Sequence, residues 1–167
     1  MSVLPIVRFP ESILKKPTRR IERIDGEVLR FIDRMVMTMN HHPRCVGLAA
    51  PQVGSPLRLA VMDSSRNPKA QESRGLLVLI NPVLEQAEGS LIQREGCLSV
   101  PDLTGNVHRA IKVRIGAQDS EGRLFRCQLE GFEAVIAQHE IDHLDGKLFL
   151  DRVTNMNTDV FRRKNYA

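Results

Sequence analysis

The stretch AQHEIDHLDG, residues 137–146, constrains the fold most, because it carries two histidines four residues apart with an acid directly after the first. In an α-helix, positions i and i+4 lie on one face, so both imidazoles can reach a single ion. The helical period begins at Gly131, and one continuous face carries Phe132, Val135, Ile136, His139 and His143. Buried imidazoles need partners, and a shared metal ion would satisfy both. An ordinary pair of histidines on a helix is the alternative.

Two helices are predicted with defined ends. The first covers residues 25–40, with a possible cap at Asp25 and an apolar stripe of Val28, Leu29, Ile32, Met35, Val36 and Met39. The histidine-bearing helix is predicted to end near Leu144, where Gly146 is available for a left-handed cap.

Between the two helices the apolar pattern predicts strands. Residues 57–63 and 76–81 are short apolar runs typical of strands, and the polar segment between them predicts a surface loop. Residues 111–117 and 123–129 alternate apolar and polar side chains around a DSEG turn, which predicts an antiparallel hairpin. Cys127 is then expected to face the core.

Composition favours one globular domain over residues 1–167, with 42% hydrophobic and 26% charged residues. The scarcity of aromatic residues, with one Tyr and no Trp, weighs against a single-stranded nucleic-acid binder. No export signal and no membrane span are recognised, so we expect a cytoplasmic protein that binds neither DNA nor membrane. Three cysteines is an odd number, and without an export signal it argues against a disulfide framework. Each thiol therefore requires its own explanation.

The HEIDH segment matches the H-E-x-x-H pattern, in which two histidines bind a divalent metal and the glutamate, here Glu140, acts as general base. A catalytic metal of this kind needs a third protein ligand and an open position for water. The extended pattern with a third histidine fails, because that position is Phe149. Cys97, in REGCLSVP between predicted strands, is a candidate because a thiolate binds zinc or ferrous iron well.

A third segment, CVGLAAPQVG at residues 45–54, is rich in small residues and is predicted to end a helix with a loop. Gln52 in this segment could donate an amide hydrogen bond to an oxyanion. Taken together, GLAAPQ, EGCLS and HEIDHLDG, in that order and with these separations, resemble the signature motifs of peptide deformylases. The resemblance spans most of the chain and implies an α+β fold in which antiparallel sheets pack around a central metal-binding helix.

The resemblance also implies roles for individual residues. Cys97, His139 and His143 would bind one divalent metal, with Fe²⁺ as the native ion and Zn²⁺, Ni²⁺ or Co²⁺ accepted. The metal and Glu140 would activate water for attack on the formyl carbon of an N-formylmethionyl peptide, releasing formate. The oxyanion donors would be the Gln52 amide and the Leu98 backbone N–H.

Substrate binding is expected along strand edges, with the peptide added as a strand near Val46, Gly47 and Gly96. The methionine pocket is expected at Phe132, Val135 and Ile136, for which plain core packing is an equal alternative. The partner would be nascent N-formylmethionyl chains. The basic tail, with Arg162, Arg163 and Lys164, is expected to be solvated, although it could contact ribosomal RNA.

One position departs from the family pattern, since Cys45 stands where the first motif usually opens with glycine. Either the loop needs no positive φ there, or the substitution remodels the mouth of the pocket. His41, His42 and His108 have no place in the motifs and are expected at the surface or at helix caps. A zinc endopeptidase and a noncatalytic metal- or peptide-binding homologue are the competing functions.

Overall fold

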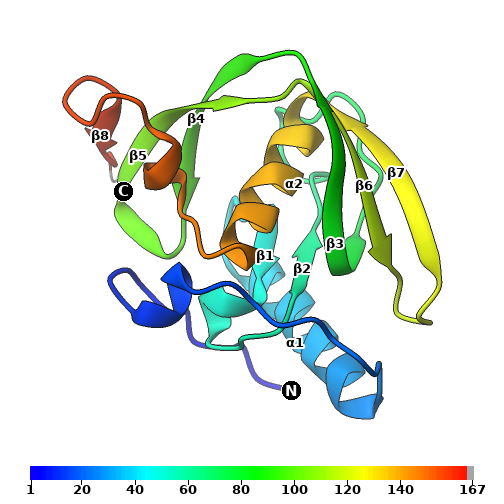
Figure 1. Cartoon of the computed structure of the whole chain (residues 1–167). Helices are drawn as coiled ribbons and strands as arrows, with labels where there is room; N and C mark the ends of the chain where they lie inside the picture. The colour runs from blue at the N-terminus through cyan, green and yellow to red at the C-terminus, as the bar shows by residue number, and fades with distance from the viewer. Residues whose placement is uncertain (165–167) are drawn as a thin grey trace.

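Helix α2 (Gly131–Leu144) lies at the centre of the fold, and Figure 1 shows strands on both sides of it. This computed structural model describes residues 1–164. The second helix is α1 (Gly26–His41), and the short 3-10 helices are η1 (Ser12–Lys15), η2 (Ala50–Val53) and η3 (Phe149–Arg152). The strands are β1 (Gly47–Ala49), β2 (Leu59–Met62), β3 (Leu77–Glu88), β4 (Leu91–Cys97), β5 (Val100–Arg109), β6 (Lys112–Gln118), β7 (Leu124–Glu130) and β8 (Val160–Arg162).

The strands form two antiparallel sheets, one ordered β1-β2-β3-β6-β7 and the other β4-β5-β8. The expected hairpin is the β6–β7 pair, in which Ile115 lies opposite Cys127. Cys127 is half-buried and packs against the core, as predicted. With α2 between the sheets, the α+β prediction of antiparallel sheets around a central helix is confirmed.

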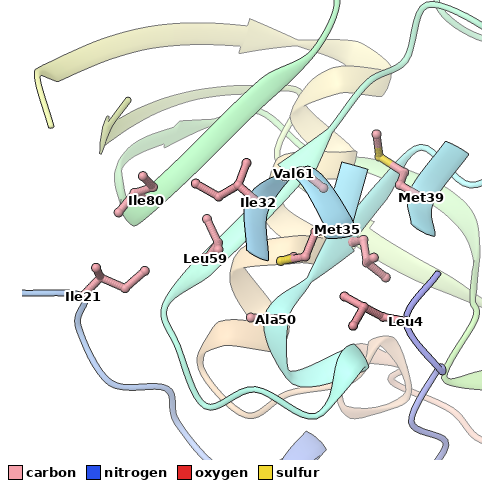
Figure 2. Close-up of a cluster of buried hydrophobic side chains, with 10 residues drawn as sticks. Leu4, Ile21, Ile32, Met35, Met39, Ala50, Leu59, Val61 and Ile80 are labelled. Carbon is pink, nitrogen blue, oxygen red and sulfur yellow. The ribbon is translucent and has the colours of Figure 1, made fainter. Parts of the chain in front are cut away.

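Burial differs along the larger sheet, because side chains alternate faces along each strand and β6 and β7 bury mainly one face. Strand β2 is buried at all four positions. Leu59 and Val61 pack with α1 residues, whereas Met62 packs with α2 residues. Figure 2 shows Ile32 and Met35 of α1 in the first of these clusters, beside Leu59. This burial on both faces explains why residues 59–62 are a continuous apolar run.

Helix α1 begins where the sequence predicted, since the Asp25 carboxylate accepts hydrogen bonds from the backbone N–H groups of Glu27 and Val28. Two residues expected to face inward, Leu29 and Ile111, are instead 39% and 43% exposed. Leu29 lies beside the buried stripe of Ile32, Met35 and Met39, and Ile111 directly precedes β6. None of the helices among residues 1–164 has the length and apolarity needed to cross a membrane.

Two local predictions around the motifs are wrong. Residues 94–101 do not lie between strands: Cys97 ends β4, and Leu98 and Ser99 form the turn into β5. Residues 45–54 do not end a helix but form β1 and η2. Both segments are short and lack a full apolar period, so their pairing with other strands decides their structure.

The C-terminal end of α2 packs against the N-terminal part of the chain at Gly146. This glycine has φ +75°, and a Cβ there would lie 2.8 Å from the carbonyl carbon of Lys16. Both the backbone conformation and the close approach therefore require glycine. The predicted left-handed cap is confirmed, and it also fixes the segment before α1 against the end of α2.

We predict that Gly146→Ala lowers the free energy of unfolding by more than about 1–3 kcal/mol, because strain at positive φ adds to a backbone clash. The matched control is Gly75→Ala, since Gly75 has φ +72° but no atom within 4 Å of an added Cβ. Urea denaturation of both variants measures the difference. Equal destabilisation would show that the close approach contributes nothing.

Candidate metal centre

Three potential metal ligands meet between the sheets. The ligand atoms of Cys97, at the end of β4, and of His139 and His143, on α2, all lie within 4.8 Å of one another. The Cys97 Sγ atom is 3.3 Å from His143 Nε2. Thiolate and imidazole donors on one tetrahedral zinc ion are about 3.6 Å apart, from the usual bond lengths. The spacing and the donor types therefore fit one divalent ion.

The surroundings of Cys97 favour the ionised thiol that metal binding requires. Burial opposes ionisation, but the adjacent His143 and His139 hold the pKa of Cys97 well below its ordinary value. The sulfur is fully enclosed between β4 and α2, with only 6% of the residue exposed. Cys97 is thus prepared for a ligand role rather than for a disulfide, since all three cysteines of the described chain are free.

A buried carboxylate orients one of the imidazoles. The Nδ1 atom of His139 is 2.8 Å from Glu95 Oε1, so its Nε2 atom remains for a metal. Burial opposes ionisation of Glu95, but hydrogen bonds from Arg109 and His139 outweigh it and lower its pKa to about 2. Glu95 is therefore a charged acceptor for His139 throughout the neutral range.

The charge on Glu95 is balanced by a buried ion network. Arg109 donates to both Glu95 carboxylate oxygens, at 2.7 and 2.8 Å, and to Asp142 at 2.6 Å. Arg152 donates to the same Asp142 at 2.8 Å. Sequence reasoning missed this network; its only signals were Glu95 inside the EGCLS motif and Asp142 on an otherwise buried helix.

Glu140 lies beside the three ligands without a full set of partners. It is 4% exposed, and its Oε2 atom has no hydrogen-bond partner among the described residues. Burial raises the pKa of Glu140. A Cβ on Gly47 would lie 2.5 Å from Glu140 Oε1, so only glycine lets β1 approach this carboxylate. A buried carboxylate with an unused oxygen is costly to stability, which is typical of a functional group.

The amide of Gln52 is fixed in the same site. Its Oε1 atom accepts from the Ala49 backbone N–H at 3.0 Å, so its Nε2 atom points the other way. That nitrogen lies 3.2 Å from Cys97 Sγ and 3.4 Å from Ser99 Oγ. Leu98, in the turn beside Ser99, lies outside the paired residues of β4 and β5. The structure thus brings both predicted oxyanion-donor residues next to the candidate ligands.

Two open strand edges border the site, because β1 and β4 each end their sheet. The carbonyl of Val46 already accepts from the Asp63 N–H at 2.9 Å, on the β2 side. Since backbone groups alternate sides along a strand, Gly47 presents its groups to the open edge. Gly96 of β4 has the Arg163 side chain against its Cα.

Cys45 adopts no left-handed conformation; the positive φ in this loop, +66°, is at Arg44. The Cys45 thiol lies 3.2 Å from the Gly47 carbonyl and donates to it. Burial and the nearby Glu140 raise the pKa of Cys45 to about 12, so the thiol remains protonated. Of the two explanations for the missing glycine, the structure therefore supports the loop that needs no positive φ at this position.

The predicted methionine pocket also serves the core. Ile136 belongs to the cluster between α2 and the larger sheet, and Phe132 packs partly buried against it. Val135 is buried as well. Core packing therefore accounts for part of this face, and the pocket role stays a prediction. His41 and His108 are exposed and His42 is half-buried.

The sequence and the fold are both similar to those of known proteins. A family model described as polypeptide deformylase matches residues 3–159. The chain is 44% identical over 165 residues to a peptide deformylase from Desulfosudis oleivorans, covering 98% of this chain and 93% of that protein. It is 45% identical over 151 residues to one from Aquifex aeolicus, covering 90% and 88%. The crystal structure of the Thermotoga maritima peptide deformylase superposes with a TM-score of 0.85 at 33% identity, covering 93% of this chain and 100% of that one.

We predict that Glu95→Gln weakens Co²⁺ or Zn²⁺ binding by about 10- to 100-fold, because a neutral amide holds the His139 ring less firmly. Competition with a chelator measures the affinity, and circular dichroism checks the fold. The control is Glu85→Gln, which removes a carboxylate that pairs with Arg114 and Arg126 at the surface. Unchanged affinity in a folded Glu95→Gln protein would show that Glu95 does not support the site.

Proposed function

The chain belongs to the polypeptide deformylase family, and from this premise we propose that it removes the N-formyl group from the N-terminal formylmethionine of newly synthesised proteins, releasing formate. The observation that carries the proposal is the convergence of Cys97 with His139 and His143 beside the buried Glu140. Acting on nascent chains, the enzyme would work in the cytoplasm. The contact of the basic tail with ribosomal RNA remains a prediction; residues 165–167 of that tail lie outside the described residues.

We assign the metal to Cys97, His139 and His143, with Fe²⁺ as the native ion and Zn²⁺, Ni²⁺ or Co²⁺ as substitutes. When bound, the ion supplies Lewis-acid activation of water and of the formyl oxygen. A donor set of one thiolate and two imidazoles suits Fe²⁺ as well as Zn²⁺. Three protein ligands also leave a coordination position for water, as a catalytic site requires.

Glu140 is assigned the proton transfers. Its buried carboxylate would accept a proton from the attacking water and then donate it to the leaving methionine amine. The raised pKa and the unused Oε2 atom support this role, because a base must be able to hold the proton between the two steps. Gly47, which has no side chain, leaves room for Oε1 of this carboxylate beside β1.

The tetrahedral oxygen would be stabilised by two donors. The Gln52 amide is oriented by its bond from Ala49, and its Nε2 atom already points at Cys97 Sγ. The backbone N–H of Leu98 is the second donor. Removing one such donor costs about 10²- to 10³-fold in rate.

The substrate peptide would lie in extended form between the open edges of β1 and β4. Gly47 and Gly96 offer backbone without bulky side chains on these edges, and Val46 borders the same stretch. Backbone pairing is indifferent to side-chain sequence, as an enzyme for many nascent proteins requires. The methionine side chain would enter the face of α2 formed by Phe132, Val135 and Ile136.

We predict that the metal-loaded protein releases formate from formyl-Met-Ala-Ser and leaves internal peptide bonds of a longer substrate intact. Glu140→Ala should lower kcat by about 10²- to 10⁴-fold while the metal remains bound, because the ligands are unchanged. A coupled formate assay and metal analysis check both statements. The control is Glu130→Ala, an exposed residue directly before α2.

Two results would contradict these expectations. Cleavage of internal bonds without formate release would identify an endopeptidase. Unchanged turnover in Glu140→Ala would show that Glu140 is not the general base, although the family assignment would stand.

We also predict that the iron-loaded enzyme loses activity in air faster than the nickel-loaded enzyme, because Fe²⁺ and its thiolate ligand are open to oxidation. Half-lives of formate release under air and under nitrogen measure this difference. Equal half-lives in air would count against iron as the native ion.

A further inference from the structure

A basic pocket opens beside the candidate metal centre. It has a volume of about 420 Å³, within the range of small-ligand sites. Apolar residues 3–6 form one wall, and the remaining lining residues are Arg8, His41, His42, Leu98, Pro101 and Arg163. The lining contains no aspartate or glutamate.

The pocket borders the proposed site at Leu98, which directly follows the ligand Cys97. Arg163 reaches the same place from the other side, because its side chain lies against Gly96 at the open edge of β4. An extended peptide advances about 3.3–3.6 Å per residue. Because the lining residue Leu98 directly follows the ligand Cys97, a chain whose formyl group lies at the metal would pass this pocket within its next few residues.

Backbone hydrogen bonds fix both arginines in position. The N–H groups of Val7 and Phe9 donate to the carbonyls of Gln52 and Ser99, at 2.7 and 2.9 Å, which holds Arg8 between them beside the site. The N–H of Arg163 donates to the Asp102 carbonyl at 2.8 Å.

No acidic side chain among the described residues pairs with the charge in this pocket. Among residues 1–164, neither Arg8 nor Arg163 takes part in an ion pair. Burial and the neighbouring His41 lower the pKa of His42. The two guanidinium groups carry positive charge at neutral pH. Guanidinium groups bind carboxylates with good geometry.

We propose that this pocket binds the carboxylate of an acidic side chain at the second or third position of the formylated chain. The proposal rests on the deformylase function and adds to it a preference among substrates. Nascent proteins with Asp or Glu directly after formylmethionine, or one residue later, are then processed most efficiently. Since the charges act on binding rather than on chemistry, the preference appears in KM.

The test uses formylated tetrapeptide amides with Asp, Asn or Lys at the second or the third position. Amidation matters, because a free C-terminal carboxylate on a short peptide would offer the same chemistry as an acidic side chain. A half-exposed charge pair is worth up to about 1 kcal/mol, which corresponds to about fivefold. We expect kcat/KM for the Asp peptide to exceed that for the Asn peptide by about this factor at low salt, with Lys lowest.

Two variants test whether Arg8 and Arg163 cause the preference for Asp. The double variant Arg8→Gln/Arg163→Gln should process Asp and Asn peptides equally, and Arg163→Glu should favour Lys. The matched control Arg23→Gln/Arg30→Gln changes the net charge by the same amount at two exposed arginines outside the pocket, and it should keep the preference for Asp. The Glu140→Ala protein should leave formyl peptides intact, so their binding can be measured directly. Their Kd values should follow the same order, with the Asp peptide binding most tightly and the Lys peptide least tightly.

The outcomes separate this proposal from the proposed function. Formate release with equal kcat/KM for Asp and Asn at both positions would overturn the pocket assignment alone. A preference for Asp that survives in the Arg8→Gln/Arg163→Gln protein would also overturn it. A preference seen only with free C-termini would assign the pocket to the terminal carboxylate and overturn the side-chain preference. Absence of formate release from every peptide would overturn the function and the pocket together.

Discussion

The buried charges around α2 are the constraint on which the rest of the structure depends. A helix that carries two histidines and three acids is costly to bury between two sheets unless most of these groups are paired. Arg109 supplies the pairing, because its guanidinium joins Glu95 of β4 to Asp142 of α2. The same ion network therefore links the smaller sheet to the helix and orients His139.

The hydrogen bonds and ion pairs that balance the buried charges do not reach every polar atom of the candidate metal centre. Within the described residues, the buried side-chain polar atoms left without hydrogen bonds are Glu140 Oε2 and His143 Nδ1. Both belong to the H-E-x-x-H segment, whereas Glu95 and Asp142 are fully paired. Ion pairs thus stabilise the supporting residues, and among the described residues the unpaired buried polar atoms lie only where chemistry is proposed. Unpaired polar atoms of this kind lower stability, so they are retained for function.

The predictable part of the structure is the part governed by local pattern. The 3.6-residue period identified α2 and α1, and the period of two identified the β6–β7 hairpin. Strand β1 and the β4–β5 hairpin were missed, because three residues such as GLA carry no period and pair through contacts distant in sequence. Arg109 was missed for the same reason: nothing local indicates that it will meet Glu95 across the hairpin and Asp142 on α2.

The same local geometry explains why position 47 is glycine and why position 45 can be cysteine. Gly47 must lack a side chain because Glu140 occupies the space of its Cβ. Position 45 has no positive φ, so a side chain is tolerated there. The thiol of Cys45 then donates to the Gly47 carbonyl, an acceptor that an added peptide strand would also use. Because a thiol is a weak donor, a peptide N–H replaces it at little cost, and the departure from the family motif is compatible with an intact edge.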